Sequence, residues 1–566
     1  MAKAKTEKTA PPAQAAQKTD SQFAAKLKRS LSPLSIACGV SLLLCAAIYW
    51  LRLNTVFGHP YVDDAYYVVS AKALATGQGY ALINSLSPHL QPMYPPGFAF
   101  LLSLVWRVAS AFPANIYWLK ALQVVAVLAA GGLAYVYCKR YRRLPEWLSL
   151  GIALATVTSP SLVFFATSTL MSECAFLLWQ MLTLAAAAEA VRQYRAKAAR
   201  LATIGATLAG LLAACAFLTR SIGIALVMAV LAWFLKERMM KPLLIAAAVV
   251  ALIVLPWQLY ARAHAPSEEL KREQQGYITQ NYATSFWQRS AGEEENATIT
   301  LRDLPARVGN NFGNIVGQQF GLLYVSRLLL IAGEIGLGLA SLLLSALAFV
   351  GLINRWRKDL TAAEVYVTLS LGFIMLWPWD PMRFLLPLTP LLLFYVVQGG
   401  QALWAWRQQR KAATQPPPSK WIFATVLVGL MTALNLISNF EFIGGLDAQG
   451  RRNAGELGQF TEIETMMNWV KENVAENETC ASLNPGLVYL YANRKTVSAQ
   501  DPLGNWEAWK KWGVRYLVLT NSYGVPERDT AGKPIRVAYQ SKRMPLLRVI
   551  DLGSPNERAP WPTEMK

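Results

Sequence analysis

Residues 61–104 read YVDDAYYVVSAKALATGQGYALINSLSPHLQPMYPPGFAFLLSL and place two adjacent carboxylates just after an apolar run that is long enough to cross a membrane. The first part of this stretch predicts a short amphipathic helix. Asp63 and Asp64 fall in its first turn, where the helix dipole favours negative charge. Gly77 and Gly79 then end the helix, because glycine readily takes the left-handed backbone geometry of a helix end. We therefore expect both carboxylates on an ordered element close to the membrane.

The composition is that of a membrane protein rather than of a soluble one. Of the 566 residues, 54% are hydrophobic and only 16% are charged. Repeated apolar runs then predict membrane helices, each of about 20 residues. The formal net charge of +20 does not indicate nucleic acid. The Lys and Arg clusters fall between the apolar runs, where the positive-inside rule explains them, so no nucleic-acid partner is expected.

Cysteine and histidine are too scattered to define a metal site. Five of the six cysteines lie in or beside apolar runs, and none forms a CxxC pair. The pattern supports neither a zinc site nor a disulfide framework. The three histidines could meet at a metal only by convergence in the folded chain.

The start of the chain sets the predicted orientation in the membrane. Residues 1–30 are rich in Lys, Ala, Gln, Pro and Thr and predict a disordered basic tail in the cytoplasm. Residues 31–51 predict an uncleaved first span, because no small-residue cleavage site follows them. Residues 52–115, which carry the carboxylates, then form the first external loop. Within this loop the apolar run 98–112 is too short to span and predicts a half-buried helix at the membrane surface.

Cationic loops on one side predict about eleven crossings in the membrane part, residues 31–440. Two of the basic clusters that mark the cytoplasmic side lie at 139–143 and 192–200, and a polar stretch at 261–320 predicts a large external loop. The predicted spans cover residues 31–51, 117–137, 147–158, 162–190, 201–218, 222–235, 243–259, 322–353, 362–377, 384–397 and 421–437.

Residues 441–566 change character and predict a small external domain of mixed structure. The segment TEIETMMNWVKENV at 461–474 has helical periodicity, whereas LVYLY at 487–491 and VRYLVLT at 514–520 predict short strands. About a hundred residues is a common size for one domain. The expected fold class is thus an all-α polytopic membrane protein with a small C-terminal α/β domain.

The acidic residues in or beside apolar runs are the first candidates for chemistry. In one interpretation, Asp63 or Asp64 is a general base on an acceptor hydroxyl or amine and its neighbour positions it. In the other, both only cap a helix, since acids at a helix N-terminus are favourable without any function. Tyr66 flanks the pair as a candidate for substrate binding. Glu173 lies within an apolar run, where a charge is costly and faces either a substrate cavity or a structural arginine partner.

Three arginines lie on the side opposite the positive-inside bias, so that bias does not explain them. Arg220 and Arg383 fall at predicted external turns, and Arg262 opens the large external loop. A guanidinium group can hold a lipid phosphate by two parallel hydrogen bonds. The alternative is snorkelling to the interface or pairing with an acid such as Asp380.

Aromatic residues near these turns are candidates for contact with a sugar. Tyr94 lies in the turn YPPG, and Trp377 and Trp379 flank Pro378. Their rings could stack on a pyranose face. They could equally belong to the belt of aromatic residues at a membrane interface.

Several motifs, in this order, resemble the GT-C membrane glycosyltransferases. The similarity points to the branch of the protein O-mannosyltransferases and the lipid A aminoarabinose transferases, and it covers the membrane part. The motifs are Asp-Asp after the first span, AKALATGQGY (71–80), YPPG (94–97), SEC (172–174), TRSIG (219–223) and PMRFLLPLTP (381–390).

The resemblance implies an inverting transferase that takes a sugar from a polyprenyl-phosphate carrier on the external face and passes it to a lipid, glycan or protein. It implies that Asp63 is the catalytic carboxylate, with Asp64 as its neighbour. It also implies that Arg220 and Arg383 bind the donor phosphate. Cationic groups aimed at the departing phosphate stabilise the transition state more than the ground state, so the assignment is physically reasonable.

Some relatives in this family place a glutamate just before the second-loop proline, near where this chain has Met93 and Tyr94. Its absence predicts an enzyme that needs no metal and no other cofactor. The sugar and the acceptor stay open. The absence of secretory disulfides and the compact loops favour a bacterial inner membrane, with the N-terminus cytoplasmic and the C-terminal domain periplasmic.

Two other classes of protein remain as alternatives. A polytopic transporter or flippase for a lipid-linked or anionic substrate would also combine many spans with an intramembrane Glu173 and external arginines. A membrane scaffold would use its external domain to bind a partner. The aspartate pair separates them, because a scaffold should tolerate Asp63→Asn.

Overall fold

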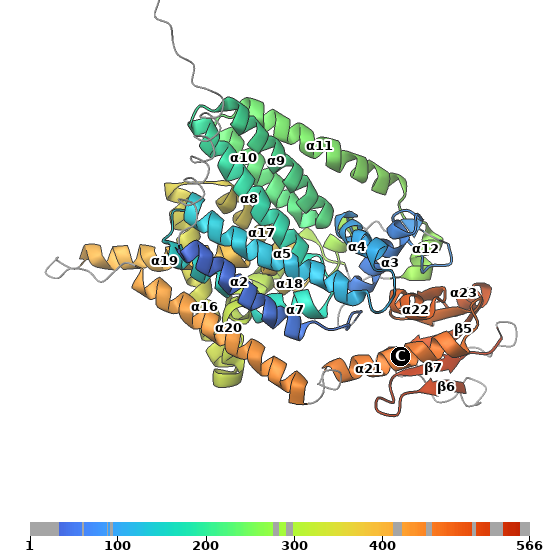
Figure 1. Ribbon diagram of the computed structural model, residues 1–566. Coiled ribbons are helices and arrows are strands. Elements are labelled where there is room, and N and C mark those ends of the chain that lie inside the picture. The colour runs from blue at the N-terminus through green and yellow to red at the C-terminus, as the bar shows by residue number, and fades with distance from the viewer. Residues whose placement is uncertain are drawn as a thin grey trace, which may run out of the picture.

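The computed structural model describes residues 33–58, 62–87, 89–90, 94–275, 282–289, 298–410, 421–448, 456–500, 505–520 and 536–554. The tail predicted at 1–30 lies outside these residues. Long helices gather in one bundle, and a sheet with its helices lies beyond one end of it (Figure 1). The fold class predicted from the sequence is therefore confirmed.

Within the described residues, eight helices are long and apolar enough to cross a membrane. They correspond to eight of the eleven predicted spans. They are α2 (Pro33–Arg52), α5 (Ile116–Val136) with the π-helical turn η1 (Tyr137–Tyr141), α8 (Glu173–Arg195), α9 (Ala199–Thr219), α11 (Met240–Ala263), α16 (Leu328–Lys358), α18 (Met382–Leu385) with η6 (Leu386–Leu388) and α19 (Thr389–Arg410), and α20 (Ile422–Ala448).

The other three predicted spans are shorter or broken. The run 147–158 becomes α6 (Glu146–Val157), which continues after a bend of 48° into α7 (Pro160–Ser168). The runs 222–235 and 362–377 become apolar helices too short to pass the same test. These are α10 (Ile224–Lys236), which follows the 3₁₀ turn η2 (Ser221–Gly223), and α17 (Ala362–Leu376).

Side chains satisfy the backbone where α6 and α7 break. The Tyr49 hydroxyl donates to the carbonyl of Val157 at 2.6 Å, and Asn439 Nδ2 donates to the carbonyl of Thr158 at 2.8 Å. An unpaired peptide group in hydrocarbon costs several kcal/mol, so a break needs such partners from other helices. The same reasoning applies between α7 and α8, where Gln123 Nε2 donates to the carbonyl of Thr169 at 2.6 Å.

The break after α7 corrects the predicted span 162–190. Its first residues belong to α7, and α8 starts only at Glu173. Glu173 therefore lies at a helix N-terminus, where the backbone dipole favours a negative charge, and not in the middle of an apolar run.

Two glycines let α16 and α19 pack with their backbones nearly in contact. A Cβ at Gly351 would overlap the carbonyl of Tyr395, and a Cβ at Gly399 would overlap the carbonyl of Leu347. Small residues at such positions are the usual means of close packing between membrane helices, because hydrocarbon gives no hydrophobic drive to associate.

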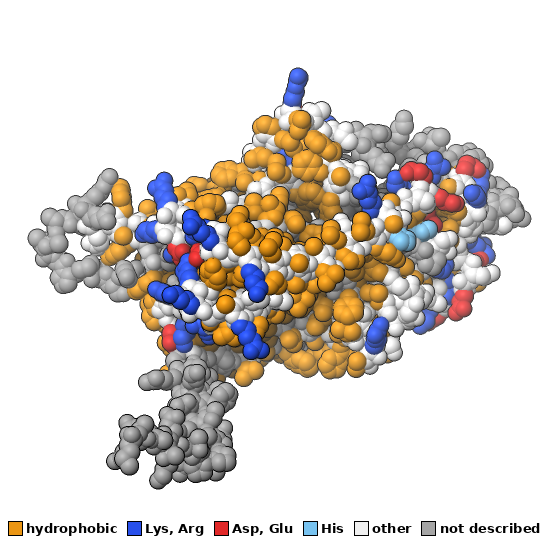
Figure 2. Space-filling model, turned by 90° about the horizontal axis from the view of Figure 1, so that it is seen from above, with side chains coloured by type: hydrophobic (Ala, Val, Ile, Leu, Met, Phe, Trp, Pro, Cys, Tyr) orange, Lys and Arg blue, Asp and Glu red, His pale blue; other side chains and the backbone are white. Residues whose placement is uncertain are grey.

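The outer face of the bundle is largely hydrophobic in the view from above (Figure 2). Exposed apolar side chains such as Leu43, Leu252 and Ile335 lie on three of the spanning helices. Lys and Arg lie toward both ends of this face, and its middle is mostly apolar (Figure 2). Basic residues lie in the last turns of α8, α10 and α16, namely Arg192, Arg195, Lys236, Arg355, Arg357 and Lys358.

The first predicted external loop contains the expected short helix and the expected half-buried one. The helix α3 (Asp63–Ala75) is followed by the two short antiparallel strands β1 (Ala81–Leu82) and β2 (His89–Leu90). The helix α4 (Gly97–Val108) packs on α3 and α9. A Cβ at Gly97 would lie 2.7 Å from the carbonyl oxygen of Leu218, so α4 approaches α9 very closely.

The predicted large loop 261–320 holds several helical segments, and α11 continues into its start. Asn311 donates from Nδ2 to the carbonyls of Met375 and Trp377, at 3.0 and 2.9 Å, and so caps the end of α17. The segments are α12 (Glu268–Gln274), α13 (Tyr282–Phe286), η4 (Leu301–Asp303), α14 (Leu304–Asn314) and η5 (Ile315–Gln319), before α15 (Phe320–Val325).

The C-terminal domain is a mixed α/β domain, as predicted. Its sheet has the strand order β4-β3-β5-β7-β6, with β3 parallel to β4 and β5, and β7 antiparallel to β5 and β6. The elements are α21 (Glu456–Asn473), β3 (Thr479–Ser482), α22 (Pro485–Ala492), β4 (Thr496–Ser498), α23 (Trp506–Lys511), β5 (Val514–Leu519), β6 (Arg536–Gln540) and β7 (Arg548–Asp551).

One strand of this domain was predicted wrongly. The run LVYLY lies in α22 and not in a strand. Asn484 caps this helix and Pro485 occupies its first turn, where proline is favoured, so the local start signal prevails over the β propensity of Val and Tyr. The helix α22 lies directly against α3 (Figure 1).

Candidate active site

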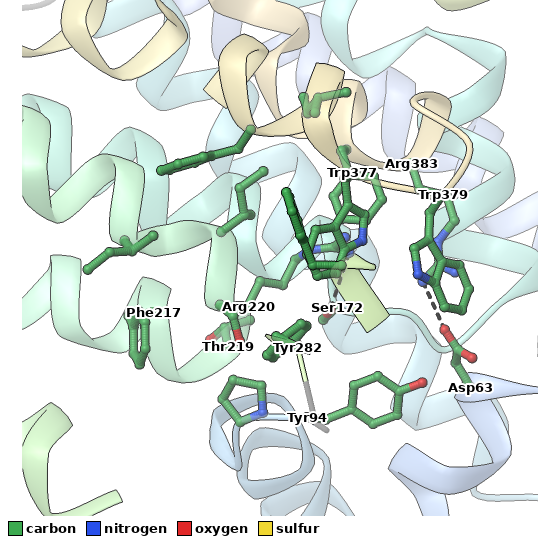
Figure 3. A pocket seen from close by; sticks show the side chains of 18 of the residues that line it. Asp63, Tyr94, Ser172, Phe217, Thr219, Arg220, Tyr282, Trp377, Trp379 and Arg383 are labelled. Carbon is green, nitrogen blue, oxygen red and sulfur yellow. Dashed lines mark hydrogen bonds and ion pairs between the residues drawn. The ribbon is translucent and has the colours of Figure 1, made fainter. Parts of the chain in front are cut away.

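A cavity of about 600 Å³ opens at the end of the bundle next to α3. Among the described residues, the charged side chains that line it are Asp63, Arg220 and Arg383. They face the cavity together with a group of aromatic rings (Figure 3). Most of the remaining wall is apolar. The tyrosine and tryptophan rings that line the cavity are those of Tyr67, Tyr94, Trp257, Tyr282, Trp377 and Trp379.

An ionic network of two arginines and two acids lies in and directly behind one wall of this cavity. Arg383 Nη2 donates to Asp63 Oδ2 at 3.0 Å, and Arg383 Nε donates to Glu173 Oε1 at 3.1 Å. Arg220 Nη1 lies 2.5 Å from the same Glu173 oxygen. Two positive and two negative side chains are therefore paired with one another. We call Asp63, Glu173, Arg220 and Arg383 the ionic network below.

Each member of the network comes from the end of a different helix. Asp63 opens α3, Glu173 opens α8 and Arg220 follows the last residue of α9. Arg383 is the second residue of α18. Helix ends carry unsatisfied backbone groups and partial charges, so polar side chains are cheapest to place there within a membrane protein.

The turn after α9 shows how the sequence aims one of these side chains. Arg220 has extended backbone geometry, with φ −149° and ψ 133°. The chain then reverses so tightly that a Cβ at Gly223 would lie 2.7 Å from the Cα of Phe217. This reversal turns Arg220 toward Glu173 instead of along the membrane, and its guanidinium also lies 5.1 Å from the ring centre of Phe384.

Glu173 holds the two arginines from behind the cavity wall. Its side chain is fully buried and does not line the cavity. Its Oε2 atom has no hydrogen-bond partner among the described residues, whereas Oε1 contacts both guanidinium groups. Glu173 is thus placed to orient Arg220 and Arg383, not to contact a substrate directly.

The two adjacent aspartates point into different surroundings. Asp63 lines the cavity, whereas Asp64 is fully buried and accepts a hydrogen bond from the backbone N–H of Gly58 at 2.8 Å. Burial raises the pKa of Asp64 to about 7, and the Gly58 N–H and the nearby Lys120 ammonium oppose this rise. Of the two carboxylates proposed from the sequence, only that of Asp63 can meet a ligand in this cavity.

Of the remaining candidate residues from the sequence, some line the cavity and others do not. Tyr94 lines the cavity and stacks on Tyr67, with ring centres 4.7 Å apart. Tyr66 is buried outside it, and burial raises the pKa of its hydroxyl. Arg262 is exposed on the last turn of α11 and does not line the cavity, although α11 lines it through other residues such as Trp257.

Several lining residues were not among the sequence candidates. Tyr67 lies one helical turn after Asp63, and the spacing i, i+4 could have placed both on one helix face. Ser172 precedes Glu173, and its Oγ lies 3.3 Å from the Tyr67 hydroxyl and 3.4 Å from Arg220 Nη1. Tyr282 comes from the predicted external loop 261–320, far along the chain, and no local signal connects it to this cavity.

In the described part of the chain, no group of three or more His, Cys, Asp or Glu side chains could hold a metal ion.

Trp377 and Trp379 also line the cavity, close to Arg383, so the rings that were candidates for sugar contact lie beside a cation that was a candidate for phosphate contact. The arrangement can hold an anion at the arginines and a ring against the aromatic side chains, with one carboxylate nearby.

Comparison with known proteins assigns the fold. The chain superimposes on ArnT from Cupriavidus metallidurans in the apo state with a TM-score of 0.55 and 12% identity, over 91% of this chain and 98% of that one. The same protein bound to undecaprenyl phosphate gives 0.53 at 12% identity, over 90% and 97%. The archaeal oligosaccharyltransferase AglB from Archaeoglobus fulgidus, in complex with an inhibitory peptide and a dolichol-phosphate, gives 0.50 at 12% identity, over 86% and 69%.

These similarities show that the chain has the GT-C fold that the sequence motifs resemble. Neither a protein-family model nor a curated protein sequence matches the chain.

Proposed function

We propose that this protein is an inverting membrane glycosyltransferase that takes a sugar from a polyprenyl-phosphate carrier. The observation that carries the proposal is the pairing of Asp63 with Arg383 on the wall of a largely apolar cavity. A lipid-linked sugar phosphate has one anionic group, one polar ring and a long apolar tail. The cavity offers a counterpart to each of them.

The donor phosphate would bind at Arg220 and Arg383. Guanidinium groups match phosphate oxygens with two parallel hydrogen bonds, and Glu173 holds both arginines in place. As the bond between the sugar carbon and the phosphate oxygen breaks, negative charge grows on the phosphate. Fixed cations stabilise that state more than the ground state and so speed the reaction.

Asp63 would act as the general base. The bound phosphate competes with the Asp63 carboxylate for Arg383, which frees that carboxylate to accept the proton of the acceptor hydroxyl or amine. The acceptor oxygen or nitrogen then bonds to the sugar carbon from the face opposite the leaving phosphate, so the configuration inverts. A positioned base of this kind contributes about 10²- to 10⁴-fold to the rate.

The known structures with this fold are consistent with such a donor. One holds undecaprenyl phosphate, and another holds a dolichol-phosphate and an inhibitory peptide. For this chain we propose a polyprenyl-phosphate donor and a lipid, glycan or protein acceptor, without a metal or another cofactor. The aromatic rings of Tyr94, Trp377 and Trp379 would contact the sugar.

We further propose a bacterial inner membrane, with the cavity and the C-terminal domain on the periplasmic side. The support is the charge of the helix ends, because α8, α10 and α16 all end in basic turns, whereas the cavity lies at the other end of α8 and α10, beside Ser172 and Ile222. Cationic ends face the cytoplasm in most membrane proteins. The N-terminus would then also be cytoplasmic.

Sugar transfer by the purified protein in detergent tests the proposal. Radiolabelled polyprenyl-phosphate sugars are offered with candidate acceptors, and product is measured for wild type and Asp63→Asn. Turnover by wild type that is lost in the variant supports a transferase with Asp63 as its base. If wild type consumes no donor while vesicles containing it move the lipid between leaflets, the flippase alternative is correct.

A further inference from the structure

The connection between α2 and α3 receives a hydrogen bond from the C-terminal domain. Asn484 is the N-cap residue of α22, and its Oδ1 accepts the Leu487 N–H at 3.2 Å. The amide nitrogen of the same side chain contacts a residue outside the domain, because Nδ2 donates to the carbonyl of Gly58 at 2.9 Å. Asn484 is buried, so both bonds are shielded from water.

Gly58 passes this contact on to the first turn of α3. Its N–H donates to Asp64 Oδ1 at 2.8 Å, and its carbonyl accepts from Asn484. One peptide residue thus joins the C-terminal domain to the residue next to Asp63. Asp64 is fully buried, and burying a carboxyl group is costly unless its oxygens are hydrogen-bonded.

The backbone at this contact has no spare room. Gly58 has a positive φ of 72°, and a Cβ on it would lie 2.7 Å from Leu487 Cδ1. On the other side of the contact, a Cβ on Gly486 would lie 3.3 Å from the Cβ of Ala65. The start of α22 is therefore packed tightly both on Gly58 and on the first turn of α3.

The membrane bundle holds the other end of the same connection. Lys120 of α5 is fully buried, and its Nζ donates to Asn54 Oδ1 at 2.8 Å and to the Asn54 carbonyl at 3.1 Å. The same Nζ also donates to the carbonyl of Val56. The connection is thus fixed from the bundle at residues 54 and 56 and from the C-terminal domain at residue 58.

We propose that Asn484 is a positioning residue through which the C-terminal domain sets the orientation of Asp63. The path runs from Asn484 to Gly58, from Gly58 to Asp64, and from Asp64 to its neighbour Asp63. Asp63 lies on the same helix turn but lines the cavity. A small rotation of that turn would move the Asp63 carboxylate relative to Arg383 and the acceptor. This inference rests on the proposed role of Asp63 as a base.

The test variant is Asn484→Ser. A serine hydroxyl can still accept the Leu487 N–H and cap α22, but it cannot reach the Gly58 carbonyl as the amide does. The matched control is Asn473→Ala in α21, which also removes one amide donor from the same domain, a bond from Nδ2 to the Trp469 carbonyl, but does so away from α3.

Two measurements are made on the full-length protein in detergent. The first is kcat and donor KM. Misplacing a base by a fraction of an ångström lowers the rate of the chemical step, so Asn484→Ser should lower kcat by about tenfold or more with little change in KM. The arginines and the aromatic wall of the cavity are untouched, which is why donor binding should be retained.

The second measurement is amide hydrogen exchange, which does not depend on activity. Asn484→Ser should speed exchange in peptides covering residues 62–75 by about tenfold and leave β3 and β5 unchanged, because only the contact with α3 is loosened. The control variant should match wild type in both measurements.

Unchanged exchange in residues 62–75 overturns the proposal, and so does a kcat within about twofold of wild type. Faster exchange throughout the C-terminal domain also overturns it, because the cap would then be only structural. If wild type shows no transfer from any carrier, the proposed function fails, and the exchange experiment alone still decides whether Asn484 holds α3.

Discussion

Arg383 Nη2 lies 3.0 Å from Asp63 Oδ2, although 320 residues separate the two in the chain. The same guanidinium also holds Glu173, which in turn holds Arg220. In the cavity the Asp63 carboxylate is therefore paired with the Arg383 guanidinium, a cation that an anionic substrate can also bind. This relationship generates the first two predictions.

Asp63→Asn should abolish most turnover while the protein stays folded. The amide keeps the size of the side chain and can still contact Arg383, but it cannot accept the acceptor proton, so kcat should fall by about 10²- to 10⁴-fold. Sugar transfer and thermal unfolding in detergent are measured together. Asp359→Asn, which removes a carboxylate paired with Arg355 on the surface, is the control and should transfer at the wild-type rate. Full activity of Asp63→Asn would rule out its role as the base.

Arg220→Lys should weaken donor binding. A lysine keeps the positive charge but loses the planar pair of N–H groups that match two phosphate oxygens, so donor KM should rise by about tenfold or more. Arg262→Ala is the comparison, because Arg262 is exposed outside the cavity and its loss should leave KM nearly unchanged. A larger effect at Arg262 than at Arg220 would place the phosphate elsewhere.

Asp64 should make the stability of the protein fall with rising pH. Burial raises its pKa from 3.8 to about 7, so between these values the folded state holds a proton that the unfolded chain has lost. Stability therefore decreases from about pH 4 to about pH 7 and then levels off, by up to about 4 kcal/mol for the full shift.

The contribution of Asp64 is measured as the difference between wild type and Asp64→Asn. Thermal unfolding midpoints are recorded at several values between pH 5 and pH 8, where the variant should show the flatter curve. Asp359→Asn should follow the wild-type curve. An equal slope in wild type and Asp64→Asn would show that Asp64 does not titrate in this range.

Gly399→Ala should destabilise the bundle, whereas Gly372→Ala should not. A Cβ at Gly399 would overlap the carbonyl of Leu347 and force α16 and α19 apart. A Cβ at Gly372 in α17 would meet nothing within 4 Å. Alanine is otherwise the better residue in a helix by about 1 kcal/mol. Thermal unfolding in detergent should thus give opposite changes, and equal changes would contradict the packing of α16 on α19.

The hydrophobic pattern of the sequence was enough to locate the apolar helices of the bundle. All eleven apolar runs predicted as spans have helical counterparts, because hydrocarbon thickness and backbone hydrogen bonding leave a long apolar segment little choice but a helix. Local rules also placed Asp63 at the first turn of a short helix and Phe98 in a half-buried one. The α/β character of the C-terminal domain followed from its periodicity in the same way.

The residues of the candidate site could be predicted only in part from the sequence. Asp63, Arg220, Arg383 and Tyr94 were proposed because charges and rings at predicted external turns could serve a substrate site as well as a structural role, and all four line one cavity. Their proposed roles stay predictions. The sequence could not separate Asp63 from Asp64, because the direction of a side chain in the first turn depends on what packs there.

What the sequence by itself determined is therefore the apolar helices of the bundle and the chemical types of the residues in the turns between them, since both depend on local hydrophobicity, charge and backbone hydrogen bonding. Only the tertiary structure decided that the ends of α3, α8, α9 and α18 meet. It also decided that Glu173 begins a helix and that Asn484 reaches Gly58. These contacts depend on the packing of segments far apart in the chain, and packing between helices in a membrane is set by small residues and buried hydrogen bonds whose partners the local sequence does not identify.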